Sequence, residues 1–364
     1  MSEPKKHHYV PQFYLKNFSE DRKNINLYNF KRDHFIGGAP ISGQCYRRKL
    51  HSFQPGLEQR LGEMEQEASA AIRAILDIRE APPIQAKEWM DMLIFTIFQK
   101  SRTARSIESA ETMKDFYIDH LTSGNAPEPG SAVEKIVADK TTSAQIVFSI
   151  IPEIAGVVTD LKMHLLINDT PEDFLVGDDP VVLHNMYCEG TTHRGVLGWD
   201  CRGLQAFVPL SPKILLMLYD LETYRVNGDR GAQHTTTLQS TRDIRSLNSL
   251  QALNAHENLY FYGAPTPDLE TFCHQMQEKR VKGRSTLVIT KPTKEADGTT
   301  SQLLHTFEPL LPIRLAPSFI KIRQSAKSVP LHQRSALYRH PLPKQIHPNV
   351  GRHTRYEVSD MQHR

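Results

Sequence analysis

The stretch DFLVGDDPVVL, residues 173–183, decides the fold class of this 364-residue chain. Two short apolar runs flank Gly177-Asp178-Asp179-Pro180, which has the composition of a tight turn, so the stretch predicts two strands. Three nearby segments also have strand-like patterns: KMHLLIND (162–169), LQAFVPLSP (204–212) and KILLMLYD (213–220). The chain is therefore expected to be rich in strands from residue 162 onward.

Upstream of this region the apolar residues follow a helical period. GLEQRLGEMEQEASAAIRAILDIRE (56–80) places apolar residues on one face at three- and four-residue steps, and Pro82-Pro83 end this helix. WMDMLIFTIFQKSRTARSIESAETMKDFYIDHL (89–121) predicts a second helical stretch with a break near Ser106 and a buried first part. Residues 131–140 and 142–161 continue as helices, with a kink at Pro152.

The remaining elements complete an α+β pattern. INLYNF (25–30) predicts a strand, and HFIGGAPIS (34–42) predicts a strand, a Gly-Gly turn and another strand. Helices are expected over 241–255 and 269–280, and strands over 258–263 and 285–292. The chain thus has a short β start, a helical middle layer at about 53–161 and a mixed, β-rich half at about 162–292.

We expect one domain over residues 1–292, a terminal strand and loop extension over 293–326, and an irregular, mobile tail over 327–364. The tail is basic: from Lys321 to Arg364 nine Lys and Arg face Glu357 and Asp360, a net +7. This leaves −4 for the rest of the chain, since the whole carries +3. Such an arm binds nucleic acid or an acidic partner, or it is only a solvated tail with no specific partner.

Composition excludes several classes of protein. Hydrophobic content of 39% and charged content of 23% are those of a soluble globular chain, and no apolar run reaches the ~20 residues that span a membrane. The start of the chain does not resemble a secretory signal. Four scattered cysteines form no CxxC pair, which favours a reducing cytoplasm over a disulfide framework. Neither GxGxxG nor GxxxxGK[ST] occurs, so no nucleotide cofactor is indicated.

Two candidate sites lie in the first part of the chain. His8 stands in HHYVPQFYL (7–15) and is either a metal ligand, a general base or phosphate donor, or an ordinary structural histidine. Glu58 and Glu65 are seven residues apart, which is about two helical turns, so both carboxylates point to nearly the same side. They either bind a divalent cation or form a solvated acidic face.

Two further candidates lie near the ends of apolar segments. Gln99 and Arg102 in FQKSRT (98–103) follow the most apolar helix, where Arg102 either clamps a phosphate or carboxylate or pairs with an acidic residue. Asp178 and Asp179 in the central turn suit metal coordination or general base work, but Asp-Asp-Pro is also an ordinary turn sequence.

Six segments together resemble the bacterial family catalogued as domain of unknown function 4238, because they occur there in this order. They are HHYVPQFYLKNF (7–18), LEQRLGEMEQEA (57–68), FQKSRT (98–103), LVGDDPVVL (175–183), VPLSPKILLML (208–218) and SLNSLQALNAHENLYFY (246–262). The resemblance covers about residues 5–262 and extends toward 292, and the chain beyond about 326 has no counterpart in it.

The central turn departs from the family pattern. The family has Ser or Thr, then one Asp and Asn-Pro, so Asp178 matches its Asp, and Asp179 replaces its Asn. Gly177 stands where a hydroxyl is usual, which weakens any mechanism that needs one. The resemblance implies no established activity, but it implies that polar residues on the shared motifs meet in one pocket: His8, Glu58, Glu65, Gln99, Arg102, Asp178 and Asn248.

Two functions from different classes follow. The first is a metal-dependent phosphodiesterase or nuclease, such as a bacterial toxin or defence effector. In it Glu58, Glu65 and Asp178 hold Mg²⁺ or Mn²⁺, with four further residues in catalytic roles: His8, Gln99, Arg102 and Asn248. The second is a non-catalytic binding or regulatory protein, in which the same polar residues form a structural network and the tail recruits a partner.

Overall fold

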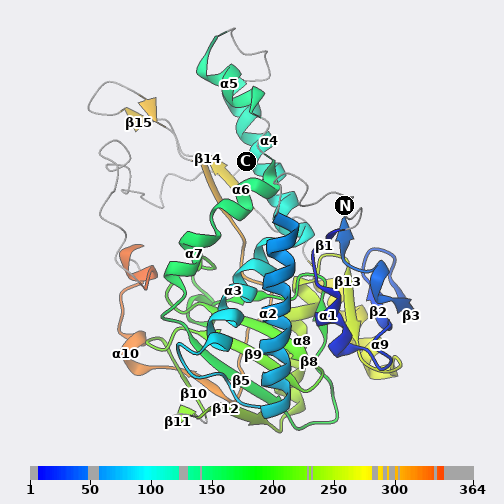
Figure 1. Cartoon of the computed structure of the whole chain (residues 1–364). Helices are drawn as coiled ribbons and strands as arrows, with labels where there is room; N and C mark the ends of the chain where they lie inside the picture. Colours follow the sequence, from blue (N-terminus) through cyan, green and yellow to red (C-terminus); the bar gives the residue numbers. More distant parts are fainter. Residues whose placement is uncertain are drawn as a thin grey trace.

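The computed structural model confirms the α+β fold class (Figure 1). The structure describes residues 7–47, 57–122, 130–139, 142–227, 229–230, 233–280, 286–289, 293–294, 300–301, 304–331 and 334–339. Within these ranges, none of the helices is long and apolar enough to cross a membrane.

A six-stranded sheet forms the centre of the fold. Its strand order is β11-β12-β5-β9-β8-β7, and all neighbours are antiparallel except β12 and β5. The strands are β5 (Lys162–Asn168), β7 (Val182–His184), β8 (Gln205–Ser211), β9 (Ile214–Tyr219), β11 (Asp229–Arg230) and β12 (Gln233–Leu238). The prediction of a strand-rich region from residue 162 is confirmed.

Both faces of this sheet are covered, which explains its nearly continuous apolar strands. In β9, Ile214, Leu216 and Leu218 pack in one core, while Leu215 and Met217 pack in a second core on the opposite face. Alternate side chains of a strand point to opposite faces, so a strand buried on both sides has no polar alternation. All six residues of β9 are buried for this reason.

A four-stranded sheet of order β3-β2-β13-β6 lies beside the first. Its strands are β2 (Asn24–Asn29), β3 (His34–Pro40), β6 (Val176–Gly177) and β13 (Asn258–Phe261). The prediction of a turn at Gly37-Gly38 is wrong: β3 runs through both glycines, and its pairing with β2 shifts register between Ile25 and Leu27. Gly38 has φ +63°, so it supplies a bulge where a turn was expected.

The other strands pair two by two. They are β1 (His7–His8) with β4 (Tyr46–Arg47), β10 (Tyr224–Val226) with β18 (Ile320–Ile322), β14 (Thr286–Ile289) with β17 (Leu304–Phe307), and β15 (Thr293–Lys294) with β16 (Thr300–Ser301). Short 3-10 helices occur at Lys16–Phe18, Ile41–Gly43, Met186–Cys188 and Arg334–Leu337.

One face of the six-stranded sheet is covered by the helical middle of the chain and its N-terminal segment. Here α1 (Gln12–Leu15), α2 (Leu57–Ile78) and α3 (Lys87–Ser101) contribute to the first core, and Figure 1 shows α2 standing across β5, β8 and β9. The predicted break near Ser106 lies slightly earlier, because α3 ends at Ser101 and α4 (Ala104–Thr122) begins after Thr103. The hydroxyl of Thr103 accepts the backbone N–H of Ser106 and so starts the new helix.

Three short helices follow α4: α5 (Ala132–Ala138), α6 (Ser143–Ser149) and α7 (Ile151–Val157). Thr142 and Gln145 form a capping box at the start of α6. Pro152 sits in the first turn of α7, where its missing N–H costs no helix hydrogen bond, so the expected kink is a separation into two helices.

The opposite face of the sheet is covered by α8 (Thr241–Asn254), by α9 (Pro267–Lys279) and by the chain after residue 307, which includes α10 (Gln324–Lys327). The expected helix over 241–255 is confirmed. Leu311, Leu315 and Phe319 from the later segment are buried in the second core. This segment therefore belongs to the packed body.

The ordered body extends past residue 326, where the tail was expected to begin. The guanidinium of Arg339 is 4% exposed and pairs with Asp160 at 2.8 Å. It also donates to the backbone carbonyls of Val157, Trp199 and Cys201, each at 2.8 Å. A buried arginine whose three guanidinium nitrogens all donate to the body fixes its segment there. Residues 340–364, the rest of the expected tail, lie outside the described residues.

Replacing Arg339 by Ala is expected to lower the free energy of unfolding by about 3 kcal/mol, because Asp160 and three carbonyls lose their charged donor. Urea denaturation followed by circular dichroism measures the change. The matched control is Lys321→Ala, an exposed cation of the same segment, with an expected change within about 0.5 kcal/mol. Equal effects of the two substitutions would contradict this anchoring role.

Candidate functional site

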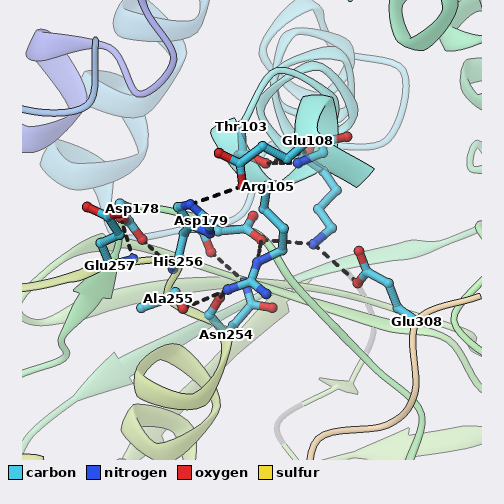
Figure 2. Close-up of polar contacts among 12 residues, drawn as sticks. Thr103, Arg105, Glu108, Asp178, Asp179, Asn254, Ala255, His256, Glu257 and Glu308 are labelled. Carbon is cyan, nitrogen blue, oxygen red and sulfur yellow. Dashed lines mark hydrogen bonds and ion pairs between the residues drawn. The ribbon is translucent and has the colours of Figure 1, made fainter. Parts of the chain in front are cut away.

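Asp178 lies at the end of β6 in a nest of backbone N–H groups. Its Oδ1 accepts the N–H of His256 at 2.5 Å, and its Oδ2 accepts those of Glu257 at 2.8 Å and Asn258 at 3.0 Å. Figure 2 shows the carboxylate beside His256 and Glu257. These consecutive N–H groups lie between the end of α8 and the first residue of β13, so they need an acceptor that regular structure does not supply.

The nest also sets the electrostatics of Asp178. The carboxyl is 1% exposed. Burial raises the pKa of Asp178, whereas the N–H donors of His256, Glu257 and Asn258 favour the charged form and oppose this rise. Both oxygens of the carboxyl group already accept hydrogen bonds from the protein, so Asp178 acts here as an internal hydrogen-bond acceptor.

Asp179 is fully buried and faces cations from the end of α3 and the start of α4. Its Oδ2 lies 3.3 Å from Nζ of Lys100 and 3.4 Å from Nε of Arg105. Its Oδ1 has no hydrogen-bond partner among the described residues. Lys100 also lies 3.8 Å from the carboxylate of Glu308, so it connects the central turn with the segment after β17.

Three amide side chains of α8 bind the backbone of the central turn, residues 177–180, and of the residues just before it. Asn248 accepts the N–H of Leu175 and donates to the carbonyl of Asp173, both at 2.9 Å. Gln251 accepts the N–H of Gly177 at 3.0 Å and donates to the carbonyl of Pro180 at 2.9 Å. Asn254 donates to the carbonyl of Asp179 at 2.6 Å. Their three-residue spacing places all three on one face of the helix.

The close approach of helix and turn explains Gly177. A Cβ at this position would lie 3.1 Å from Cβ of Ala255 and 3.3 Å from the carbonyl oxygen of Gln251. A hydroxyl-bearing side chain would crowd the end of α8, so this chain has glycine where the resemblance expected Ser or Thr.

Two arginines cap the C-terminal end of α8. Arg105 donates to the carbonyls of Asn254 and Ala255, at 3.0 and 2.7 Å (Figure 2). Arg280 donates to the carbonyls of Ala252 and His256, both at 2.8 Å. Burial, followed by the neighbouring Arg105, lowers the pKa of Arg280 to about 10, so it remains charged at neutral pH. Positive charge at this end of a helix is stabilising.

A second polar cluster joins α2, α3 and the N-terminal segment. Arg102, 1% exposed, donates to Glu65 at 2.7 Å and to Oε1 of Gln99 at 3.1 Å. Gln99 donates in turn to the carbonyl of Tyr9 at 2.8 Å. Arg102 also lies over the ring of Phe98, 4.8 Å from its centroid. Of the two roles predicted for Arg102, the structure shows the pairing with an acidic residue, which is Glu65 of α2.

The predicted site residues therefore fall into separate groups. Glu65, Gln99 and Arg102 meet in one cluster, while Asp178 and Asn248 belong to the central turn. His8 is a half-buried residue of β1. Its Nε2 lies 3.4 Å from Nε2 of Gln12 and 3.4 Å from the carbonyl oxygen of Ser42. The side chain of Glu58 lies outside the described residues. In the described ranges no three His, Cys, Asp or Glu side chains are placed to hold a metal ion.

Sequence reasoning did not single out several residues that connect these groups. Lys100 lies within the FQKSRT motif and Arg105 two residues after it, so the two cations around the end of the most apolar helix were an available signal. Tyr9 and Cys45 carry no such signal. The N–H of Tyr9 donates to the carbonyl of Cys45 at 2.7 Å, and the thiol of Cys45 lies 3.2 Å from the hydroxyl of Tyr260.

Comparison with known proteins identifies one family. A family model described as "Protein of unknown function (DUF4238)" matches residues 6–264. No curated protein and no solved structure matches the chain. The match contains the Asp178 nest and the Arg102 cluster but ends before Arg280, Glu308 and Arg339.

Replacing Asp178 by Ala is expected to lower the free energy of unfolding by about 3–5 kcal/mol, because three buried N–H groups lose their acceptor. Chemical denaturation measures the loss. Asp169→Ala, an exposed aspartate after β5, is the control and should change stability by less than about 0.5 kcal/mol. An Asp178→Ala protein as stable as the control would refute the nest's structural role.

The four cysteines are buried and form no disulfides. All four are expected to resist thiol reagents in the native protein. Burial raises the pKa of Cys188, Cys201 and Cys273 to about 12 and raises that of Cys45 as well. A raised pKa keeps the thiol protonated at pH 8, and only the thiolate reacts. Ellman's reagent at pH 8 should report no thiol before unfolding and all four in guanidinium. Rapid native labelling of any cysteine would contradict this.

Proposed function

We propose that this chain, which belongs to the DUF4238 family of proteins of unknown function, is a non-catalytic binding protein whose motif residues hold its layers together. One observation carries the proposal. Asp178 is the motif residue best suited to catalysis, but both its carboxylate oxygens accept hydrogen bonds from the N–H groups of His256, Glu257 and Asn258.

The other described motif residues support the same role. Arg102 is bonded to Glu65 and Gln99, and both polar ends of the Asn248 amide are bonded to the backbone of the central turn. A catalytic arginine or amide needs donors directed at a substrate, whereas these donors are directed at the protein itself. Buried networks with every member satisfied stabilise one arrangement of the layers.

A metal-dependent nuclease remains the competing prediction, and it requires a different arrangement. For Asp178 to bind Mg²⁺ or Mn²⁺, the ion would have to reach a carboxylate that is 1% exposed and already accepts three N–H groups. Glu65 would have to turn from Arg102, which would leave a buried arginine without its carboxylate. Each change carries a cost that the binding role avoids.

The charge of the C-terminal segment also bears on a nucleic-acid partner. Of its nine Lys and Arg, Arg323 and Arg339 are bonded to backbone carbonyls of the body. The residues from 340 onward carry four Lys and Arg, at positions 344, 352, 355 and 364, against Glu357 and Asp360, a net +2. Such a small charge gives weak attraction to a phosphate backbone, so we place ligand binding in the folded body.

The test is a cleavage assay with RNA, single-stranded DNA and duplex DNA, each with Mg²⁺, Mn²⁺ or chelator. We expect wild-type protein to cleave none of them, and Asp178→Ala to melt roughly 5–10 °C lower because its nest is empty. Asp169→Ala is the control for substitution alone. Metal-dependent cleavage by the wild type that Asp178→Asn abolishes while keeping a native circular dichroism spectrum would overturn the binding role and establish the nuclease.

A further inference from the structure

An open pocket of about 400 Å³ lies between the loop before β8 and the segment that follows β17. Its volume is in the range of sites for small molecules. It lies apart from the Asp178 nest, and its lining combines apolar, aromatic and charged groups: Thr191, His193, Arg194, Gly195, Val196, Phe307, Glu308, Pro309 and Leu310.

One wall of the pocket contains two side chains stacked on each other. The guanidinium carbon of Arg194 lies 5.5 Å from the centroid of the Phe307 ring. Gly195 has φ +69°, and a Cβ there would lie 4.0 Å from the Cβ of Phe307, so the loop turns beside this residue. Guanidinium and phenyl groups both stack on planar heteroaromatic rings.

The polar groups of the pocket divide into donors and one acceptor. Arg194 and the half-buried His193 supply N–H donors, which suit an anionic group such as a phosphate. Glu308 supplies the acceptor, which suits the N–H groups of a nucleobase. Lys100 lies 3.8 Å behind this carboxylate and 3.3 Å from buried Asp179, so the body holds Glu308 in place.

We propose that this pocket binds a planar heteroaromatic ligand that carries an anionic group, the chemical class of the nucleotides. The inference deepens the proposed binding function and rests on it. The ring stacks on the outer face of the Arg194–Phe307 pair, its N–H edge meets Glu308, and the anion meets His193 and the N–H edge of Arg194. No glycine-rich phosphate loop takes part, in agreement with the absence of those motifs from the sequence.

The first test is isothermal titration of the full chain with adenosine 5′-monophosphate, adenosine and inorganic phosphate. The monophosphate should bind, and each of its halves should bind at least about tenfold more weakly, because each engages only part of the lining. Failure of the folded wild type to bind the monophosphate at millimolar concentration overturns the inference, as does phosphate binding as tightly as the monophosphate.

Variants then locate the site. Arg194→Ala and Glu308→Gln are each expected to weaken binding of the monophosphate about tenfold. The control Arg225→Ala removes an exposed arginine on β10, outside the pocket lining, and should leave the affinity unchanged. Equal affinities of Arg194→Ala and wild type would place the ligand elsewhere and overturn the inference.

The two proposals fail separately. Absence of monophosphate binding together with absence of nuclease activity overturns the ligand class alone and leaves the binding role of the protein. Metal-dependent cleavage that requires Asp178 overturns the binding role, whatever the titration gives.

Discussion

The structure depends on one carboxylate held by the N–H groups of three consecutive residues. Asp178 lies beside the junction where α8 ends and β13 begins, and it directly follows β6, which pairs with β13. The N–H groups at the junction between the helix and the strand have no partner in the helix and need another acceptor. The charge of Asp178 satisfies these groups from a segment nearly eighty residues earlier in the chain, and so it fixes the four-stranded sheet to the helix behind it.

The same junction must then balance charge on its other side. The carbonyls at the end of α8 carry partial negative charge, and buried Asp179 adds a full one. Lys100, Arg105 and Arg280 face these groups, and Arg105 bonds to carbonyls while lying near Asp179. The adjacent aspartates thus have different surroundings: Asp178 is neutralised by backbone dipoles and Asp179 by side-chain cations. Without these partners, two neighbouring buried carboxylates would repel each other.

The fold class and most elements follow from the sequence, whereas the site does so only in part. Periodicity predicts α8 and the strand-rich half because both faces of β9 and one face of α8 are apolar. The predicted position of the break, near Ser106, lies a few residues too late. The observed position depends on the hydroxyl of Thr103, which accepts a backbone N–H. Motif residues were expected to share one pocket, since polar side chains in a motif suggest a ligand. Sequence cannot reveal that the partner of Asp178 is backbone, because N–H groups carry no residue identity.

The segment after the family match completes the second core and one wall of the open pocket. The match ends at residue 264, yet Leu311, Leu315 and Phe319 fill the second core, and Phe307 and Glu308 form one wall of the open pocket. Without them the second face of the six-stranded sheet would expose apolar side chains, and the loop carrying Arg194 would lose its aromatic neighbour. The matched part therefore lacks some of the second core, and the proposed ligand site depends on a segment that the match does not include. A ligand found for this chain should be tested on other members only where they have an aromatic and an acidic residue in the corresponding segment.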